Sequence, residues 1–352
     1  MRLLWINANP NPNPGGTELH SIDFINALEE LNSIELFKVV AKGSFVDRHT
    51  SDRNKFYVSL RSEFSPANTL KLIRIARNLK PHVVVGNNGK EYLNTYMAGR
   101  LSGAYVVLFR HMLNRLPPLL VSLVLKRVDK IVAVSEASKR RLMAQGIEEA
   151  KIEVIPNFVD EGRFSLKEGE KEALRKLLGV AEDEVVVSFL GKVAEGKGIF
   201  DFYEVAKRLS KSPVKFKFFV IGYGRDLEKV RERAIKDGIY GRFLFTGMTE
   251  EPEKYLKASD ILLALSRGEE SFGRVVVEGF ATKNLVFVYD VENLKYLVEN
   301  GVNGFVCKMG NIEEISRLVL EVIKERNRFY KLREEAYKTY LINYTRRVRN
   351  SL

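Results

Sequence analysis

Apolar runs of strand length alternate with amphipathic segments of helix length along most of the chain. In the first half, the pattern predicts strands at 3–7, 34–40, 82–86, 104–109 and 130–134 and helices at 17–31, 67–79, 91–101 and 118–127. Strands that alternate with helices are typical of parallel sheets with crossover connections. The first half therefore predicts an α/β domain.

The same alternation restarts after residues 156–160. It predicts strands at 185–190, 216–221, 243–245, 260–264, 285–289 and 304–307 and helices at 199–209, 226–237, 251–258, 274–282, 294–300 and 313–328. We expect two doubly wound, Rossmann-like domains, residues 1–160 and 161–330, that face each other across a cleft. A basic, tyrosine-rich helical segment at about 331–352 is expected to pack back on the first domain.

Composition supports this class of protein. The length of 352 residues suffices for two domains, and 45% hydrophobic with 29% charged residues is typical of a soluble globular protein. A single cysteine, Cys307, rules out an internal disulfide and a multi-cysteine metal site. Because no apolar run reaches about 18 residues and the N-terminal run is too short for a signal peptide, we expect a cytoplasmic protein.

The formal net charge of +12 predicts an anionic partner. Nucleic acid is disfavoured, because basic residues are spread along the chain and no zinc-knuckle spacing or RRM-type motif occurs. An anionic membrane surface and a phosphorylated small molecule remain, with an ordinary solvated surface as the alternative. The apolar stretch 116–125 is interpreted as a buried helix, with a membrane-facing surface as its alternative, and basic residues at 346–349 are a second candidate for membrane contact.

Glycine-rich turns follow the first strand of each domain. Gly15 and Gly16 precede the first helix, whose free amides would favour a phosphate. Gly191 begins a turn that carries Lys192 and Lys197, whose charges suit a diphosphate. Each turn also has a plain explanation, a strand-to-helix connection without a ligand in the first case and a solvated basic turn in the second.

Two further positions follow predicted strands. Gly222 and Gly224 look like the start of a dinucleotide fingerprint, but Leu227 occupies the place of the third glycine, which argues against a nicotinamide or flavin enzyme. His111 lies beyond the strand 104–109, beside Arg110, and is interpreted as binding an anion or a sugar hydroxyl. A packed or capped histidine is the alternative.

Glu270 and Glu278 carry the most informative signal. We expect Glu270 on a strand-to-helix loop and Glu278 inside the helix that follows. Eight positions span slightly more than two helical turns, so if the segment from Phe272 onward is helical, the two acids are expected on a similar face, looking into one cleft. Apolar residues surround Glu278, and since a semi-buried carboxylate without a partner is costly, ligand hydroxyls would satisfy it. The alternative is that Glu270 is an acid at a helix N-terminus, favoured by the helix dipole, and that Glu278 is an ordinary exposed helix residue.

Taken in order, these segments resemble the retaining glycosyltransferases of the GT-B fold, in particular family 4 of nucleotide-sugar-dependent enzymes. The matching segments run from residue 15 to about 310 and are Gly15-Gly16-Thr17-Glu18, Val134-Ser135-Glu136, 154–160, Gly191 with Lys197-Gly198, Gly222 with Gly224, Phe245-Thr246-Gly247 and 270–278.

The resemblance implies a role for each matched position. Glu278 would hold the ribose hydroxyls and Glu270 would contact the donor sugar, while Lys197 with Lys192 would neutralise the diphosphate. His111 would touch the donor sugar on its acceptor-facing side. The other implied substrate contacts are Gly15, Gly16, Gly191, Gly222, Gly247, Met248, Ser271, Phe272, Gly273, Arg274 and Asn157. The implied reaction retains the anomeric configuration and uses no metal or cofactor, in agreement with the absence of an Asp-x-Asp triplet.

Three departures from the family pattern leave the donor sugar open. Lys192 stands where the family usually has arginine, so a forked contact becomes a point charge. Residues 291–295 replace the usual Gly-Gly-x-x-Glu, and Phe158 replaces a small residue after Asn157.

The leading hypothesis is a glycosyltransferase that uses a nucleoside diphosphate sugar and a saccharide, lipid-linked or small-molecule acceptor. The alternatives are another GT-B activity, such as a nucleotide-sugar epimerase, and a catalytically silent nucleotide-sugar-binding protein. The presence of Glu270, Glu278 and Lys197 argues against the silent protein. The first domain is expected to supply the acceptor surface, with a basic group that would face an anionic membrane, namely Lys126, Arg127, Lys130, Lys139, Arg140 and Arg141.

Overall fold

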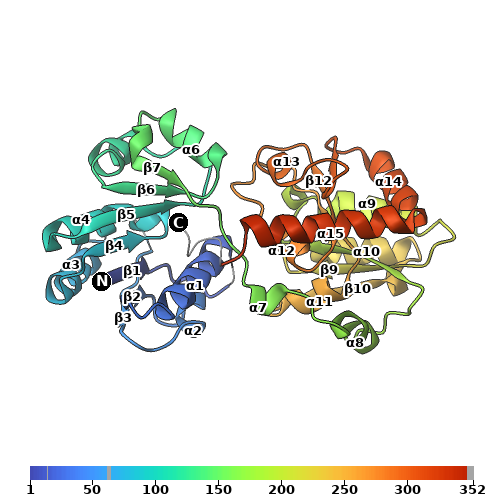
Figure 1. Cartoon of the computed structure of the whole chain (residues 1–352), viewed down its shortest axis with the longest axis horizontal. Coiled ribbons are helices and arrows are strands. Elements are labelled where there is room, and N and C mark those ends of the chain that lie inside the picture. Colours follow the sequence, from blue (N-terminus) through green and yellow to red (C-terminus); the bar gives the residue numbers. More distant parts are fainter. Residues whose placement is uncertain (14, 62–64, 347–352) are drawn as a thin grey trace. The chain divides into compact units, whose positions relative to one another are not determined.

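The computed structural model describes residues 1–13, 15–61 and 65–346, and the chain divides into two compact units, Met1–Asn157 and Phe158–Leu352. Each unit is built on one parallel sheet (Figure 1). The predicted class, two parallel α/β units, is confirmed.

The first unit has a seven-stranded sheet in the order β3-β2-β1-β4-β5-β6-β7. Its strands are β1 Arg2–Asn7, β2 Glu35–Val40, β3 Lys55–Tyr57, β4 Val83–Gly86, β5 Tyr105–Arg110, β6 Lys130–Ala133 and β7 Ile152–Val154. All neighbouring strands pair in parallel. The two edge strands, β3 and β7, are three residues long and were not predicted from the sequence.

Helices cover both faces of this sheet. They are α1 Gly16–Glu29, α2 Phe45–Arg48, α3 Pro66–Leu79, α4 Tyr92–Ser102, α5 Pro118–Leu120 and α6 Glu136–Met143, with short 3₁₀ turns at Gly89–Glu91 and Glu149–Lys151 and a π turn at Val121–Leu125. Leu4 of β1 belongs to the core beneath α3 and α4, whereas the next residue, Trp5, packs with Ile25 of α1. Because successive side chains enter opposite cores, the central strands are mostly apolar at consecutive positions.

The second unit has a six-stranded parallel sheet in the order β10-β9-β8-β11-β12-β13. Its strands are β8 Val185–Leu190, β9 Phe216–Ile221, β10 Phe243–Gly247, β11 Ile261–Ala264, β12 Leu285–Tyr289 and β13 Gly304–Cys307. Its helices are α7 Glu161–Phe164, α8 Glu170–Leu177, α9 Ile199–Leu209, α10 Leu227–Lys236, α11 Pro252–Ala258, α12 Arg274–Ala281, α13 Leu294–Leu297, α14 Ile312–Lys324 and α15 Arg326–Asn343, with 3₁₀ turns at Glu195–Lys197 and Tyr240–Arg242.

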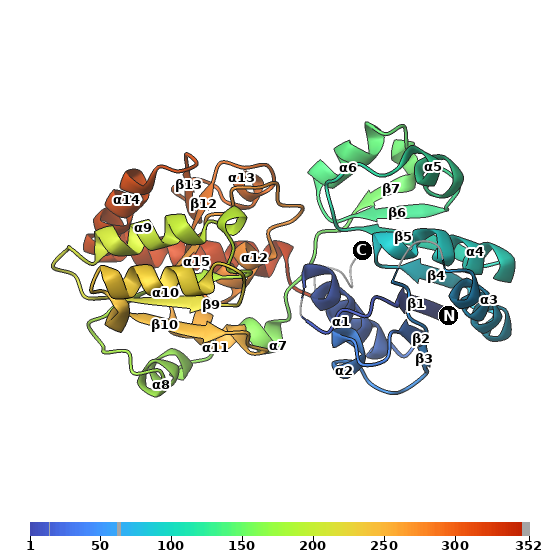
Figure 2. The same cartoon turned by 180° about the vertical axis from the view of Figure 1, so that it is seen from behind.

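Two layers of helices enclose the second sheet. Helices α9, α10 and α14 lie on one side (Figure 2), and α11, α12 and α15 lie on the other (Figure 1). The five strands other than β10 are therefore largely buried on both faces, which is why their sequences are mostly apolar, whereas the edge strand β10 is buried only at Phe243.

The long helix α15 packs against α12, α14 and β12 within the second unit. Buried Tyr340 donates its hydroxyl to the Val159 carbonyl at 3.1 Å, while Tyr330 is 61% exposed, so the predicted tyrosine stripe is buried at one position and solvated at another. Residues 347–352 lie outside the described residues. The expected packing of segment 331–352 on the first domain stays a prediction.

A buried ion cluster joins α15 to the start of β11. Asp260 pairs with Lys171 of α8 at 2.7 Å, with Arg175 of the same helix at 3.0 Å, and with Arg333 of α15 at 4.0 Å. Three cations around one carboxylate connect three segments that are far apart in the sequence, so this cluster ties both helices to the sheet.

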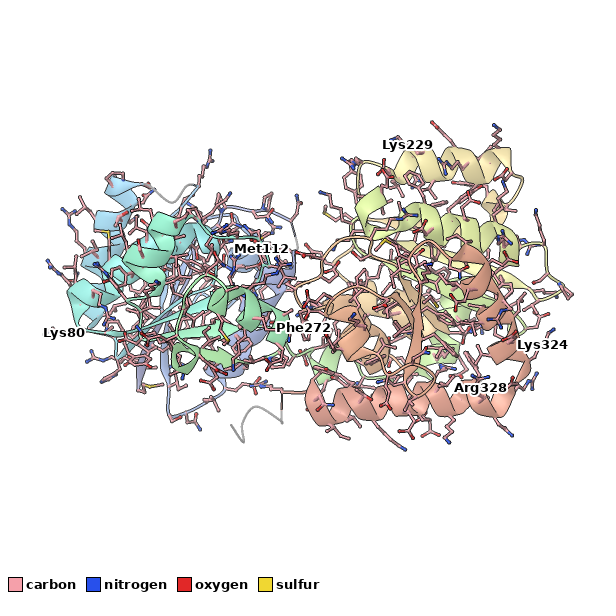
Figure 3. All side chains as sticks on the ribbon, turned by 90° about the horizontal axis from the view of Figure 1, so that it is seen from above. Lys80, Met112, Lys229, Phe272, Lys324 and Arg328 are labelled. Carbon is pink, nitrogen blue, oxygen red and sulfur yellow. The ribbon has the colours of Figure 1, made fainter. Side chains whose placement is uncertain are left out.

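Charged side chains are spread over the surfaces of both units, as the sequence predicted. Figure 3 labels Lys80 on the first unit and Lys229, Lys324 and Arg328 on the second. In the part of the chain that the structure describes, no helix has the length and apolar character that crossing a bilayer would require.

Candidate functional site

The turns after β8 and β9 pack backbone against backbone. A Cβ atom on Gly222 would lie 2.0 Å from the Gly191 carbonyl oxygen, and one on Gly224 would lie 2.2 Å from that of Val193. Such distances are closer than any side chain allows, so these positions require glycine. The predicted turn residues Gly191 and Gly222 thus lie in contact, and Gly222 also forms an isolated bridge with Gly247 at the end of β10.

A pocket of about 380 Å³ opens beside these turns. It brings together Lys192 and Lys197, as predicted, and it adds a third cation, Arg225, that the prediction did not include. The lining residues are Lys192, Ala194, Gly196, Lys197, Arg225, Ser266, Gly268 and Glu269. Its cations come from two neighbouring turns, and a site of this charge favours an anionic group.

Lys197 forms an ion pair with Glu270, so the structure unites two more of the predicted residues. Ser266 donates its hydroxyl to the same carboxylate oxygen of Glu270 at 2.8 Å. Ser266 and Glu270 lie on the loop after β11, and Lys197 lies on the turn before α9. The ion pair therefore joins two of the loops that line the pocket.

Asp201 anchors the loop that carries Glu270. Arg267 donates two hydrogen bonds to the Asp201 carboxylate, from Nε at 2.7 Å and from Nη2 at 2.6 Å, and Tyr289 donates a third at 2.8 Å. The Arg267 amide also donates to the Gly196 carbonyl at 3.0 Å. The hydrogen bond to Asp201 raises the pKa of Arg267, and burial followed by Asp201 raises that of Tyr289. The prediction omitted all three residues.

Asn293 holds the same loop from another side. Its side-chain amide donates to the Ser271 carbonyl at 3.0 Å and also to the Glu270 carbonyl. Asn293 has a positive φ of 73° and lies within residues 291–295, the segment that departs from the family pattern. A residue in this departure therefore positions the loop of Glu270.

Glu278 lies on α12 and is 4% exposed. Arg274 donates to its carboxylate at 2.8 Å from one helical turn away, so a protein group already satisfies part of the charge for which the sequence suggested ligand hydroxyls. Helix α12 begins at Arg274, so Glu270 lies outside the helix, and helical spacing does not determine how the two acids are placed.

The residues between the two acids form the entry to α12. Gly273, at φ 94°, precedes the helix, and a Cβ there would lie 2.7 Å from the Leu294 side chain. Phe272 is buried and Met248, on the turn after β10, is 52% exposed. Neither Glu278 nor Met248 lines the pocket described above.

In the first unit, the predicted residues gather at the carboxyl ends of β1, β4 and β5. Gly15 caps α1 and Gly16 is its first residue. Asn87, after β4, donates to the Thr17 carbonyl at 3.1 Å, and its oxygen lies 3.0 Å from Nε2 of His111. Asn87 thus joins the glycine turn to His111. Pro14 lies outside the described residues.

His111 is electrically neutral at physiological pH. Burial, with a smaller contribution from Arg110, lowers its pKa to about 3. Because the Asn87 amide nitrogen donates to Thr17, the Asn87 oxygen accepts from Nε2 of His111, which fixes the position of the ring proton. A neutral imidazole suits hydroxyl groups better than it suits a phosphate.

Several buried polar groups in the first unit have atoms without a hydrogen-bond partner among the described residues, and two of these groups concern the site. Both carboxyl oxygens of Glu91 and the side-chain oxygen of Asn157 are in this position. Burial raises the pKa of Glu91 to about 8, so this carboxyl is protonated at neutral pH. Asn157 is the last residue of the first unit, and its predicted contact with substrate stays a prediction.

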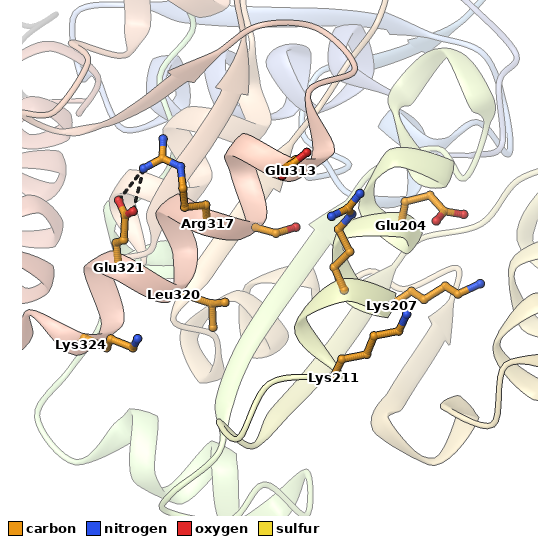
Figure 4. A pocket seen from close by; sticks show the side chains of 10 residues that line it. Glu204, Lys207, Lys211, Glu313, Arg317, Leu320, Glu321 and Lys324 are labelled. Carbon is orange, nitrogen blue, oxygen red and sulfur yellow. Dashed lines mark hydrogen bonds and ion pairs between the residues drawn. The ribbon is translucent and has the colours of Figure 1, made fainter.

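A larger groove of about 760 Å³ lies between α9 and α14, away from every predicted site residue (Figure 4). Its lining mixes both signs of charge, and Arg317 pairs with Glu321 along α14 at 2.7 and 2.9 Å. Exposed pairs of this kind along one helix are typical of a solvated surface.

Comparison with known families matches both units of the chain. Residues 14–163 match the family described as Glycosyltransferase Family 4, and residues 170–339 match Glycosyl transferases group 1.

Curated relatives match over different lengths. LpsE, a lipopolysaccharide core biosynthesis glycosyltransferase of Rhizobium meliloti, is 24% identical over 337 residues, 94% of this chain and 92% of LpsE. A 2-deoxystreptamine glucosyltransferase of Streptomyces kanamyceticus is 28% identical over 57% of this chain. The match spans about half the length of this relative, 53%, and of other curated relatives.

Solved structures show the fold. The chain is similar to Anabaena HepE in complex with UDP, with a TM-score of 0.84 at 18% identity, over 100% of this chain and 98% of HepE. It is also similar to a glycosyltransferase of Rickettsia africae, with a TM-score of 0.85 at 18% identity, over 99% of this chain and 96% of that one. The GT-B fold that the sequence resemblance implied is confirmed.

Proposed function

The chain belongs to family 4 of the glycosyltransferases, within glycosyl transferases group 1, and we propose that it transfers a sugar from a nucleoside diphosphate sugar with retention of configuration. The observation that carries this proposal is the pocket in which Lys192 and Lys197 lie beside the loop of Glu270. The pocket offers cations for a diphosphate, and one of them, Lys197, pairs with Glu270, whose carboxylate lies next to the pocket and would serve the sugar hydroxyls.

The proposed chemistry depends on charge that develops on the leaving group. As the bond between the sugar and the diphosphate breaks, negative charge grows on the phosphate oxygens, and fixed ammonium groups stabilise that state more than the ground state. Lys197 would exchange its partner Glu270 for the phosphates. The carboxylate of Glu270 would then be available to the donor sugar.

We assign the nucleoside to the region of α12. Arg274 orients the Glu278 carboxylate through a 2.8 Å hydrogen bond, which suits a group that binds two ribose hydroxyls. Structures of HepE in complex with UDP and with UDP-glucose support a uridine nucleotide as the first donor to test.

In the first unit, we assign His111 to a sugar hydroxyl. Its neutral ring, held by Asn87 and close to the glycine turn, can donate and accept hydrogen bonds without charge. Ring contacts with Phe109 and His20 hold the orientation of this partly buried imidazole.

We further propose that the acceptor is carried by an anionic membrane. Met112, Leu119 and Leu123 are 59%, 69% and 42% exposed, and no acidic residue occurs from 92 to 128. Apolar side chains beside basic ones suit a lipid surface. Co-sedimentation with vesicles that contain an anionic lipid should exceed co-sedimentation with neutral vesicles, and equal binding would remove this assignment.

A thermal-shift panel of UDP, GDP, ADP and their sugars tests the donor. A ligand at 100 times its Kd stabilises the native state by about 2.7 kcal/mol, so the true nucleotide should raise the Tm clearly. A panel in which no nucleotide raises the Tm would remove the main support for the proposal. Incubation with the stabilising nucleotide sugar then separates transfer from the alternatives, since an epimerase would change the free donor and a silent protein would leave it intact.

A further inference from the structure

A third cation shares the pocket of Lys192 and Lys197. Arg225 lies on the turn between β9 and α10, and its guanidinium is the sole one among the residues that line this pocket in the described part of the chain. The sequence prediction treated this turn as a source of backbone contacts and gave the arginine no role.

The backbone of Arg225 is fixed against the turn that carries Lys192. On one side, Val193 donates to the Tyr223 carbonyl at 3.0 Å, and on the other, the Asp226 amide donates to the Val193 carbonyl at 3.2 Å. The Glu195 amide donates to the Asp226 carboxylate at 3.0 Å. Because these bonds bracket position 225, the arginine is held beside both lysines.

The side chain of Arg225, in contrast, is not committed to a protein partner of its own. It is 74% exposed and approaches Asp226 at 3.5 Å, while that carboxylate already binds Lys229 at 2.9 Å and the Glu195 amide. Arg267, in the same region, differs from Arg225, because its guanidinium donates two short hydrogen bonds to Asp201. Arg225 can therefore turn into the pocket at little cost.

We propose that Arg225 binds the diphosphate of the nucleotide sugar and supplies the forked, bidentate contact that the two lysines cannot make. This inference rests on the proposed function. A guanidinium presents two parallel N–H groups to two phosphate oxygens, whereas an ammonium acts as a point charge. The pocket would thus hold the phosphates with two point charges and one fork.

The contact should depend on the number of phosphates. Two bonds to a charged group contribute enough that their loss weakens binding roughly tenfold or more. We therefore expect Arg225→Ala to lower the affinity for UDP by about tenfold and the affinity for UMP by about twofold or less. Arg225→Lys should recover less than half of the lost affinity on a logarithmic scale, because it restores charge without the fork.

Calorimetric titration of the full chain with UDP and UMP tests this directly. Lys236→Ala is the matched control, since it removes one exposed charge from the far end of α10 and should leave both affinities unchanged. Because Arg225 is exposed, its variants should fold, and an unchanged Tm without nucleotide verifies this.

The outcomes separate the inference from the proposed function. Wild-type binding of UDP with no loss in Arg225→Ala would overturn the inference alone, as would equal losses for UDP and UMP or an equal loss in Lys236→Ala. Full affinity in Arg225→Lys would overturn the forked contact. If the wild type bound no nucleoside diphosphate, both the inference and the proposed function would be overturned.

Discussion

The carboxyl ends of the strands differ in chemistry between the two sheets. In the first unit, the groups gathered there are joined by uncharged hydrogen bonds, from Thr17 through Asn87 to His111. In the second unit, they are ions, with Lys197 paired to Glu270 and Arg267 paired to Asp201. One architecture thus provides an edge where the hydrogen bonds that hold His111 are uncharged, with Arg110 beside them, and an edge whose side chains are paired as ions.

Burial is the physical reason for the difference. In the first unit it lowers the pKa of His111 to about 3 and raises that of Glu91 to about 8, so both groups are neutral near pH 7. In the second unit Lys197 and Arg267 are each paired with a carboxylate, which stabilises the charged form in a partly buried loop. Each of the following predictions changes one side of this contrast.

The largest effect is expected from Lys197→Ala. This variant removes the fixed positive charge that would stabilise the leaving group. Turnover should therefore fall by about 10² to 10³-fold, as for other groups that stabilise developing charge. Turnover measured with saturating nucleotide sugar checks this. Lys211→Ala, an exposed lysine in the groove of Figure 4, is the matched control, and a similar loss in both variants would contradict the ionic role of the pocket.

The second largest effect concerns the anchor of the Glu270 loop. Asp201→Asn keeps the shape but weakens both bonds from Arg267, so the loop should lose its position and turnover should fall by about tenfold. Affinity for UDP should change little, since Asp201 does not line the pocket. Tyr289→Phe removes one bond to the same carboxylate and should have a smaller effect. Equal loss of turnover and of UDP affinity would indicate general unfolding instead, and the Tm separates the two.

Glu278→Gln should act mainly on donor binding. The amide keeps the volume but loses the charge that Arg274 and two ribose hydroxyls share, so the Kd for the donor should rise by about tenfold. Turnover at saturation should stay within about threefold of wild type. An unchanged donor affinity would contradict the assignment of Glu278 to the nucleoside.

The smallest effect is a dependence of stability on pH in the first unit. The folded pKa of His111, about 3, lies below its ordinary value of 6.5, so the unfolded state binds more protons when the pH falls below 6.5. His111 therefore costs stability progressively from pH 6.5 toward pH 3. His111→Asn should remove up to about 1 kcal/mol of acid sensitivity per pH unit in this window, seen as a Tm that falls less on acidification. Parallel Tm curves for variant and wild type would contradict the neutral imidazole.

Much of the fold was predictable from apolar periodicity. Strands β8, β9, β12 and β13 have the predicted bounds, because each is a predominantly apolar run that is bounded by polar residues or glycine. Residues 118–127 were predicted as one helix but form α5 and a π turn, and the helix predicted at 294–300 ends at Leu297. The short elements β3 and α2 are too brief to show a period.

The site was predictable only in part, for a different reason. Glycines and lysines on turns that follow strands can be recognised from the local sequence. This local pattern predicted Lys192, Lys197 and Gly222 as site residues. Asp201 and Arg267 are 66 positions apart in the sequence, so the residues around either of them do not predict that they pair. The local sequence offered one signal for Asp201, namely an acidic residue among the apolar residues at the start of the amphipathic helix 199–209.

The contact between the turns after β8 and β9 has a consequence for how specificity could change during evolution or in the laboratory. Gly222 and Gly224 cannot accept a side chain, whereas the alternate positions, Tyr223 and Arg225, are 61% and 74% exposed. The turn therefore has a rigid backbone, and the side chains at two of its positions can be varied. A library restricted to residues 223 and 225 would sample new ligand preferences while leaving the framework of the sheet untouched.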